Sequence, residues 1–183
     1  MRQIQASPQL EPSDTSWREL LRAAAVAGQV DTAEAIWNQG ISYHQQRRLR
    51  FVDEPERLWQ PSTKSLQWLL TAYLREAAAS EDTDRQREMY ERVVQTYEDV
   101  IMGERRMGLQ RIDPMEILDD RRIILSIIHS LVALRPLVTA DRLAELHDTG
   151  RSLVKLDCLR EEPPLSRPAQ LAVETLHSWS LAP

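Results

Sequence analysis

Apolar residues recur along the chain at the three- and four-residue spacing of one face of an α-helix. Trp17 and Leu20 open the first such run after a polar start, and Gly28 ends it. Asp31 has the chemistry of an N-cap for a second helix, because its carboxylate can accept hydrogen bonds from backbone N–H groups. The first stretch therefore predicts a helix pair over about 14–46.

A second pair is predicted over 61–102. Pro61 stands where a helix can begin, since proline is tolerated in a first turn, and Leu66 and Leu69 follow at helical spacing. The polar residues 80–84 separate this helix from the next one. The apolar stripe of that next helix consists of Met89, Tyr90, Val93, Val94, Tyr97, Val100 and Ile101.

A third pair is predicted over 114–158. Asp113 and Pro114 combine an N-cap acid with a first-turn proline, a pattern typical of a helix start. The run that follows is the most apolar in the chain, and Pro136 ends it. The second helix of this pair is predicted to run from Leu143 to Leu156, and Gly150 is the position at which it could break. Residues 161–183 then predict a linker and one terminal helix, with its stripe on Leu171, Val173, Leu176 and Trp179.

These elements predict an all-α fold, because no segment alternates apolar and polar residues as a strand does. A helical hairpin can bury its stripe only against neighbouring hairpins, which favours a short α-solenoid of about seven helices. We expect residues 1–12 to be a disordered lead-in and 13–160 to be the helical repeat domain.

Composition and charge narrow the function classes. The chain has 183 residues with a net charge of −5, so a nucleic-acid partner would need a local basic patch. No apolar run approaches the roughly 20 residues of a membrane span. The single cysteine, Cys158, fits a reducing compartment, and we expect its thiol to be buried.

Two segments resemble the pentatricopeptide repeat family. Residues 16–21 (SWRELL) are followed by Ala27-Gly28 and then Ala33, and residues 65–73 (SLQWLLTAY) match the first segment in part, with Trp17 aligned to Leu66. The resemblance implies a right-handed solenoid and single-stranded RNA as partner. By their style, the divergent repeats are similar to those of fungal organellar members, which implies a mitochondrial location.

The same resemblance implies which residues would contact RNA. In the family, each repeat reads one base with a polar side chain near the start of its first helix, and the matching residues here are Arg18 and Gln67. Arg18 is not one of the usual base-reading types. Contact through phosphates is therefore expected rather than readout of sequence.

The densest basic cluster contains Arg47, Arg48 and Arg50. Guanidinium groups fork well onto phosphate oxygens, so these arginines are candidate RNA contacts. The alternative is a solvated helix end, since arginines favour the C-terminus of a helix and acids follow at once in 53–56. Both interpretations stay open at this point.

Neither a metal site nor an active site is predicted. The four histidines show no i,i+4 pair, HExxH or CxxC spacing, and we expect His129 to be packed in the core. No glycine-rich phosphate loop or nucleophile motif occurs, so no enzyme activity and no cofactor are expected. Trp17 and Trp37 are expected in the core, and Trp68 is expected to cover a neighbouring helix pair.

Two functions remain from the sequence. The first is an RNA-binding helical repeat protein that acts in organellar RNA processing, stability or translation. The second is a protein–protein interaction scaffold of the same architecture, for which a net negative charge is expected. Arginines that converge on one groove would favour RNA, whereas an apolar or acidic surface would favour a protein partner.

Overall fold

The computed structural model describes residues 14–48, 62–102, 119–160 and 164–180. Within these ranges the chain forms seven α-helices and no strand, so the predicted all-α class is confirmed. The helices are α1 (Asp14–Val26), α2 (Val30–Arg48), α3 (Thr63–Ala79), α4 (Thr83–Met102), α7 (Arg121–Leu134), α8 (Ala140–Leu153) and α9 (Arg167–Ser180), with short 3-10 turns at Arg135–Leu137 and Asp157–Leu159.

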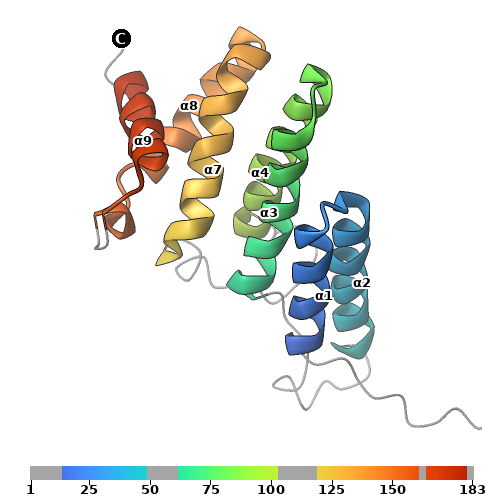
Figure 1. Cartoon of the computed structure of the whole chain (residues 1–183). Coiled ribbons are helices and arrows are strands. Elements are labelled where there is room, and N and C mark those ends of the chain that lie inside the picture. The colour runs from blue at the N-terminus through green and yellow to red at the C-terminus, as the bar shows by residue number, and fades with distance from the viewer. Residues whose placement is uncertain (1–13, 49–61, 103–118, 161–163, 181–183) are drawn as a thin grey trace, which may run out of the picture.

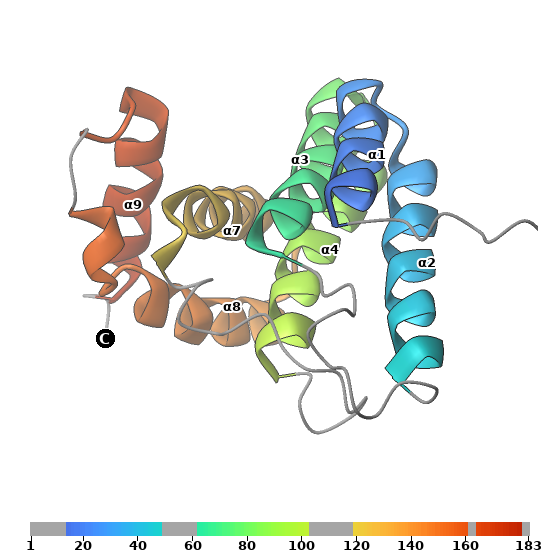
Figure 2. The ribbon, with the colours of Figure 1, turned by 90° about the horizontal axis from the view of Figure 1, so that it is seen from below.

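The helices pack in the order of the chain (Figure 1). Helices α1, α3, α7 and α9 follow one another, and each contacts the next. Seen from below, α2, α4 and α8 lie on one side of that series (Figure 2). Each hairpin therefore packs against the hairpins next to it in sequence.

The turn between α1 and α2 is a Schellman motif centred on Gly28. The N–H of Gln29 donates to the carbonyl of Ala24 at 3.0 Å, and the N–H of Gly28 donates to Ala25 at 3.3 Å. Gly28 has a φ of +69°, a conformation that favours glycine because it has no Cβ. This bonding ends α1 at the position that the sequence predicts.

Side-chain caps fix the starts of α3 and α7. The Ser62 hydroxyl accepts a hydrogen bond from the N–H of Ser65 at 3.3 Å, so α3 begins just after Pro61. The Asp120 carboxylate accepts from the N–H groups of Arg122 and Ile123 at 3.0 and 3.2 Å. The apolar run of the third pair therefore begins at Arg121, and the predicted start signal at Asp113-Pro114 lies outside the described residues.

Helix α8 contains Gly150 within its span, so the predicted helix continues through this glycine without a break. Gly150 is buried, and Leu176 of α9 packs against it. The missing Cβ allows close approach of two helices here, and the helix continues past it. Leu171, which was predicted on the buried stripe of α9, is 59% exposed, while Leu176 is 1% exposed.

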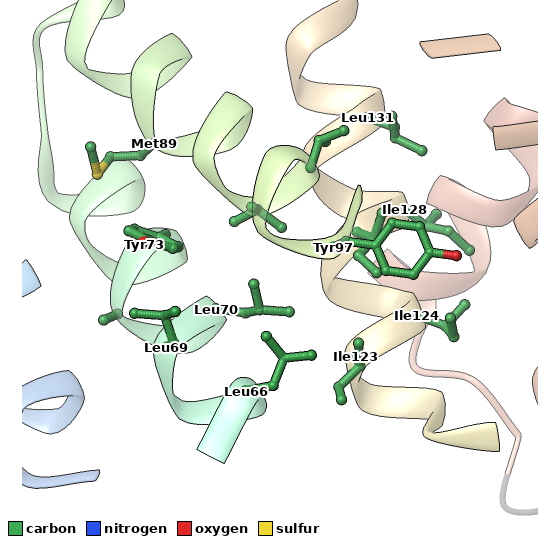
Figure 3. Close-up of a cluster of buried hydrophobic side chains, with 14 of the residues drawn as sticks. Leu66, Leu69, Leu70, Tyr73, Met89, Tyr97, Ile123, Ile124, Ile128 and Leu131 are labelled. Atoms are coloured by element: carbon green, nitrogen blue, oxygen red, sulfur yellow. The ribbon is translucent and has the colours of Figure 1, made fainter. Parts of the chain in front are cut away.

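The core is continuous from α1 to α9, and Figure 3 shows the part of it where α3, α4 and α7 meet. Leu66 and Leu70 of α3 and Ile123 of α7 are fully buried, as is Met89 of α4. Burial raises the pKa of the Tyr97 phenol to about 12, and the nearby Glu98 adds to the shift. Trp17 and Trp37 are in the core as predicted, at 7% and 8% exposure.

Candidate interaction surface

Arg18 and Gln67, predicted as RNA contacts, lie at matching positions on two neighbouring helices. Arg18 comes four residues after the first residue of α1, and Gln67 comes four residues after the first residue of α3. The Nε of Arg18 lies 3.9 Å from the carboxylate of Glu19. Arg47 and Arg48 belong to the last turn of α2, but their side chains lie outside the described part of the structure, as does Arg50.

Glu19 also pairs with a second arginine of α1. The Nη1 of Arg22 donates to Glu19 at 3.0 Å, and the guanidinium carbon lies 6.0 Å from the centre of the Trp68 ring on α3. Trp68 is partly buried, packs against the core and contacts the neighbouring hairpin through Arg22. The acid and the aromatic ring both engage Arg22, so its charge is already balanced within the protein.

Arginines on α4 join it through ion pairs to α3 of the same hairpin and to α2 of the preceding one. Arg92 donates to Glu34 of α2 and, at 2.7 Å, to Glu88 of its own helix. Arg85 donates to Glu76 of α3 at 3.2 Å and to Glu88 at 2.8 Å. The hydrogen bonds from Arg85 and Arg92 lower the pKa of Glu88 below its ordinary value, because they favour the ionised carboxylate.

A similar group connects α4 to α8. Arg142 donates from Nη2 to Glu91 at 2.9 Å and from Nη1 to Glu145 at 2.7 Å. Burial raises the pKa of Glu98, which lies within the field of the same arginine and of other acids, Glu91 first among them. The side chains of Arg85, Arg92 and Arg142 thus serve contacts between helices and do not form a free basic patch.

The outer face of α1 carries the exposed large hydrophobic side chains of the first two hairpins, Leu20 and Val26. It consists of Ser16, Glu19, Leu20, Ala23 and Val26, which follow the i, i+3, i+4, i+7, i+10 spacing of one side of a helix. All five are exposed, and Leu20 and Val26 reach 50% and 56% exposure. Leu20, which belongs to the first apolar run of the sequence, is therefore not buried with Trp17 and Leu21.

Helix α3 carries the same pattern, and there it is covered. Its inner face, formed by Ser65, Trp68, Leu69, Ala72 and Arg75, is the outer face of α1 shifted by the 49 positions that separate Asp14 from Thr63. Three residue types are identical between the two faces. Ser65, Leu69 and Ala72 are 0%, 1% and 0% exposed, whereas their α1 counterparts are exposed.

Two contacts show what covers the inner face of α3. The Trp68 ring meets Arg22 of α1, and the guanidinium of Arg75 donates to the carbonyls of Ala25 and Val26 at 3.4 and 3.0 Å. Both partners lie on α1, so this face of α3 is the one that packs against the preceding hairpin. The outer face of α1 is the equivalent surface with no described hairpin against it (Figure 1).

Helix α7 repeats the arrangement with different residues. Ile123, Ile127 and Ser130 take the places of Ser65, Leu69 and Ala72, and each is 0% exposed. The sequence alone could have pointed to this surface, because Ser-x3-Leu-x2-Ala occurs in both 16–23 and 65–72. What it could not show is which copy of the pattern is covered.

No other feature of the described residues forms a binding site as well defined as the outer face of α1. His129 is exposed rather than in the core, and its ring meets Tyr90 of α4 edge-on at a centroid distance of 5.9 Å. Cys158 is buried, as predicted. An open hollow of about 250 Å³ beside the start of α2 contains Arg85, which already binds two glutamates.

Membrane and metal chemistry find no support in the described ranges. None of their helices combines the length and apolar character that a membrane span needs. Nor do these residues bring together three histidine, cysteine or carboxylate side chains that could hold a metal ion. Comparison of the chain with family models, with curated proteins and with solved structures finds no match.

Proposed function

We propose that this chain is a protein–protein interaction scaffold, a short α-solenoid whose first helix presents a docking face for an α-helix. The observation that carries the proposal is the outer face of α1. Its Ser16, Leu20 and Ala23 have the identities of Ser65, Leu69 and Ala72, which are buried against a helix in α3. A surface that buries a helix at one place in the row is suited to bury one at another.

The energetics of this face favour a protein partner. Leu20 and Val26 are half exposed, and covering such side chains contributes roughly 25 cal/mol per Å² of apolar surface removed from water. The small side chains of Ser16 and Ala23 allow a partner backbone to approach closely, as Ala72 allows α1 to approach α3. A nucleic acid would gain little here, since phosphates seek cations and the face carries Glu19.

RNA binding remains the alternative predicted from the sequence. The arginines of the described helices support it less, because Arg18 and Arg22 share Glu19 while Arg92 and Arg142 bind carboxylates on other hairpins. Under the scaffold proposal the resemblance to pentatricopeptide repeats is one of architecture. The proposal includes neither base readout nor catalysis.

Photo-crosslinking in living cells tests the proposal. A benzophenone amino acid at Leu20 is expected to give a covalent adduct that protease digests and nuclease does not. The matched control is the same amino acid at Glu81, which is exposed in the turn between α3 and α4. An adduct at Leu20 that shrinks on nuclease treatment, or equal labelling at both positions, would contradict the scaffold proposal.

A titration with single-stranded RNA tests the alternative directly. RNA bound through phosphates loses affinity steeply as salt rises, because each neutralised phosphate releases a counterion. We expect no such binding at 50 mM salt. Tight binding with a steep salt dependence would instead favour the RNA-binding function.

A further inference from the structure

We infer that the partner of the α1 outer face is a second copy of this chain, joined through an antiparallel α1–α1 contact about a two-fold axis. This inference rests on the proposed function, because it names the occupant of the same face. Isologous two-fold contacts are the commonest form of homo-oligomer and require a surface that complements itself. The outer face of α1 meets that requirement in both size and charge.

The sizes of the side chains are self-complementary. In an antiparallel pair centred between Leu20 and Ala23, the Leu20 of each copy stands opposite the Ala23 of the other. Ser16 then stands opposite Ala27, so two small side chains meet on either side of the Leu20–Ala23 pairs. Interdigitation of this kind lets two helices pack closely without a gap. A face made of leucine alone would not have this property.

The charges are also self-complementary. Glu19 and Arg22 are one helical turn apart, and they already form an ion pair within α1 at 3.0 Å. Both lie on the same flank of the outer face, and in an antiparallel pair this flank meets its own copy. Glu19 of each copy then lies near Arg22 of the other, so the two ion pairs can exchange partners across the axis. A parallel two-fold pair would place this flank against the opposite flank, so Glu19 would not meet Arg22 of the other copy.

The two-fold arrangement also limits the assembly to two copies. A head-to-tail stack, in which the outer face of α1 receives the last hairpin of another copy, would leave the same face vacant at the end of every assembly. The antiparallel contact consumes both outer faces and stops at two copies. A contact centred on one short helix is small, so we expect a weak dimer rather than an obligate one.

Sedimentation velocity of the full chain over a concentration series tests the inference. We expect a reversible monomer–dimer equilibrium, and we expect Ala23→Glu to raise its Kd at least about tenfold, because it places two like charges within the contact. Leu171→Glu, at the exposed leucine of α9, is the matched control and should leave the Kd unchanged. Far-UV circular dichroism establishes that each variant is folded.

A charge exchange tests the antiparallel geometry itself. E19R and R22E should each weaken self-association, because each replaces two opposite-charge pairs across the axis by two like-charge pairs. An equimolar mixture of the two single variants should restore the dimer, since each chain then meets an opposite charge in the other. A simple loss of solubility or helix content would not recover on mixing.

The outcomes separate the inference from the scaffold proposal. A full-length chain that stays monomeric up to about 1 mM, or a mixture that does not recover, overturns the second copy as partner. In that case a crosslinked adduct at Leu20 with a different protein leaves the scaffold proposal standing. An adduct of twice the chain mass, together with recovery on mixing, supports both.

Discussion

The Cδ2 atom of Leu176 lies 2.7 Å from the point that a Cβ on Gly150 would occupy. Helices α8 and α9 therefore meet at a place that has room for a hydrogen atom and not for a methyl group. Leu131 of α7 stands behind the contact, with its Cδ1 atom 3.8 Å from the same point. The glycine that would weaken an isolated helix is thus the residue that lets α9 dock.

Gly150→Ala should lower the free energy of unfolding by about 1 kcal/mol or more. The overpacking against Leu176, which is almost fully buried, is expected to outweigh the gain in helix propensity of about 1 kcal/mol. In a Leu176→Ala background the same change should be neutral or stabilising. Urea unfolding of the four variants measures this coupling, and an equal effect in both backgrounds would mean that the contact is not the cause.

Gly28→Ala should also destabilise, but for a different reason. No atom lies within 4 Å of a Cβ added there, so the cost comes from the positive φ alone and should be about 1 kcal/mol. Gly28→Asn should cost less, because asparagine tolerates this conformation better. Thermal unfolding compares the two variants, and equal losses would argue against backbone strain.

Arg92→Gln should cost about 1–2 kcal/mol of stability, because it leaves the partly buried Glu34 without the cation that joins α2 to α4. The matched control is Arg87→Gln on the same helix. Arg87 pairs with Asp84 at an exposed site, so its loss should stay within about 0.5 kcal/mol. Chemical denaturation measures the loss of stability in each variant. Equal losses would show that the contact between hairpins adds no more stability than an exposed ion pair.

The stability of the fold should fall on acidification below about pH 4.5, in part through Glu88. Two arginines hold the pKa of this carboxyl below its ordinary value in the folded state. Its contribution is present above the unfolded pKa and is lost as the pH falls through the lower, folded pKa. Glu88→Gln should flatten this part of the stability profile, and an unchanged slope would exclude Glu88 as a source.

Glu98 should affect the pH dependence of stability in the direction opposite to that of Glu88. Its pKa is raised in the folded state by burial, so the stability linked to it is lost as the pH rises through the folded pKa. At pH 7, Glu98→Gln should therefore stabilise the fold by roughly a few tenths of a kcal/mol. Glu91→Gln is the contrasting variant, because it removes a carboxylate that Arg142 binds and should destabilise.

The helices could be predicted because local chemistry determines them. Gly28 ends α1, a polar segment separates α3 from α4, and the stripe around Ile127 is buried as its spacing indicates. Asp120 shows where the same reasoning fell short. The sequence pattern places the helix start at Asp113-Pro114, yet in the described residues the carboxylate of Asp120 caps the start of α7.

The interaction surface could be predicted only in part. Leu20 and Leu69 occupy the same place in the same local pattern, yet one is 50% exposed and the other 1% exposed. The difference arises from the neighbour that each helix has in the row, which no local pattern records. The role of Gly150 could not be predicted for the same reason, since the residue that packs against it, Leu176, lies on α9.

Arg75 has a consequence for how the chain is assembled on the ribosome. Its guanidinium supplies hydrogen bonds to carbonyls at the end of α1 that lie 49 and 50 positions earlier. While the chain is being made, the first hairpin emerges with both oxygens lacking the Arg75 guanidinium, and among the described residues only the Ala25 oxygen has a partner within the hairpin, the Gly28 N–H. The last turn of α1 acquires these bonds only after α3 has been synthesised, so the second hairpin completes the first.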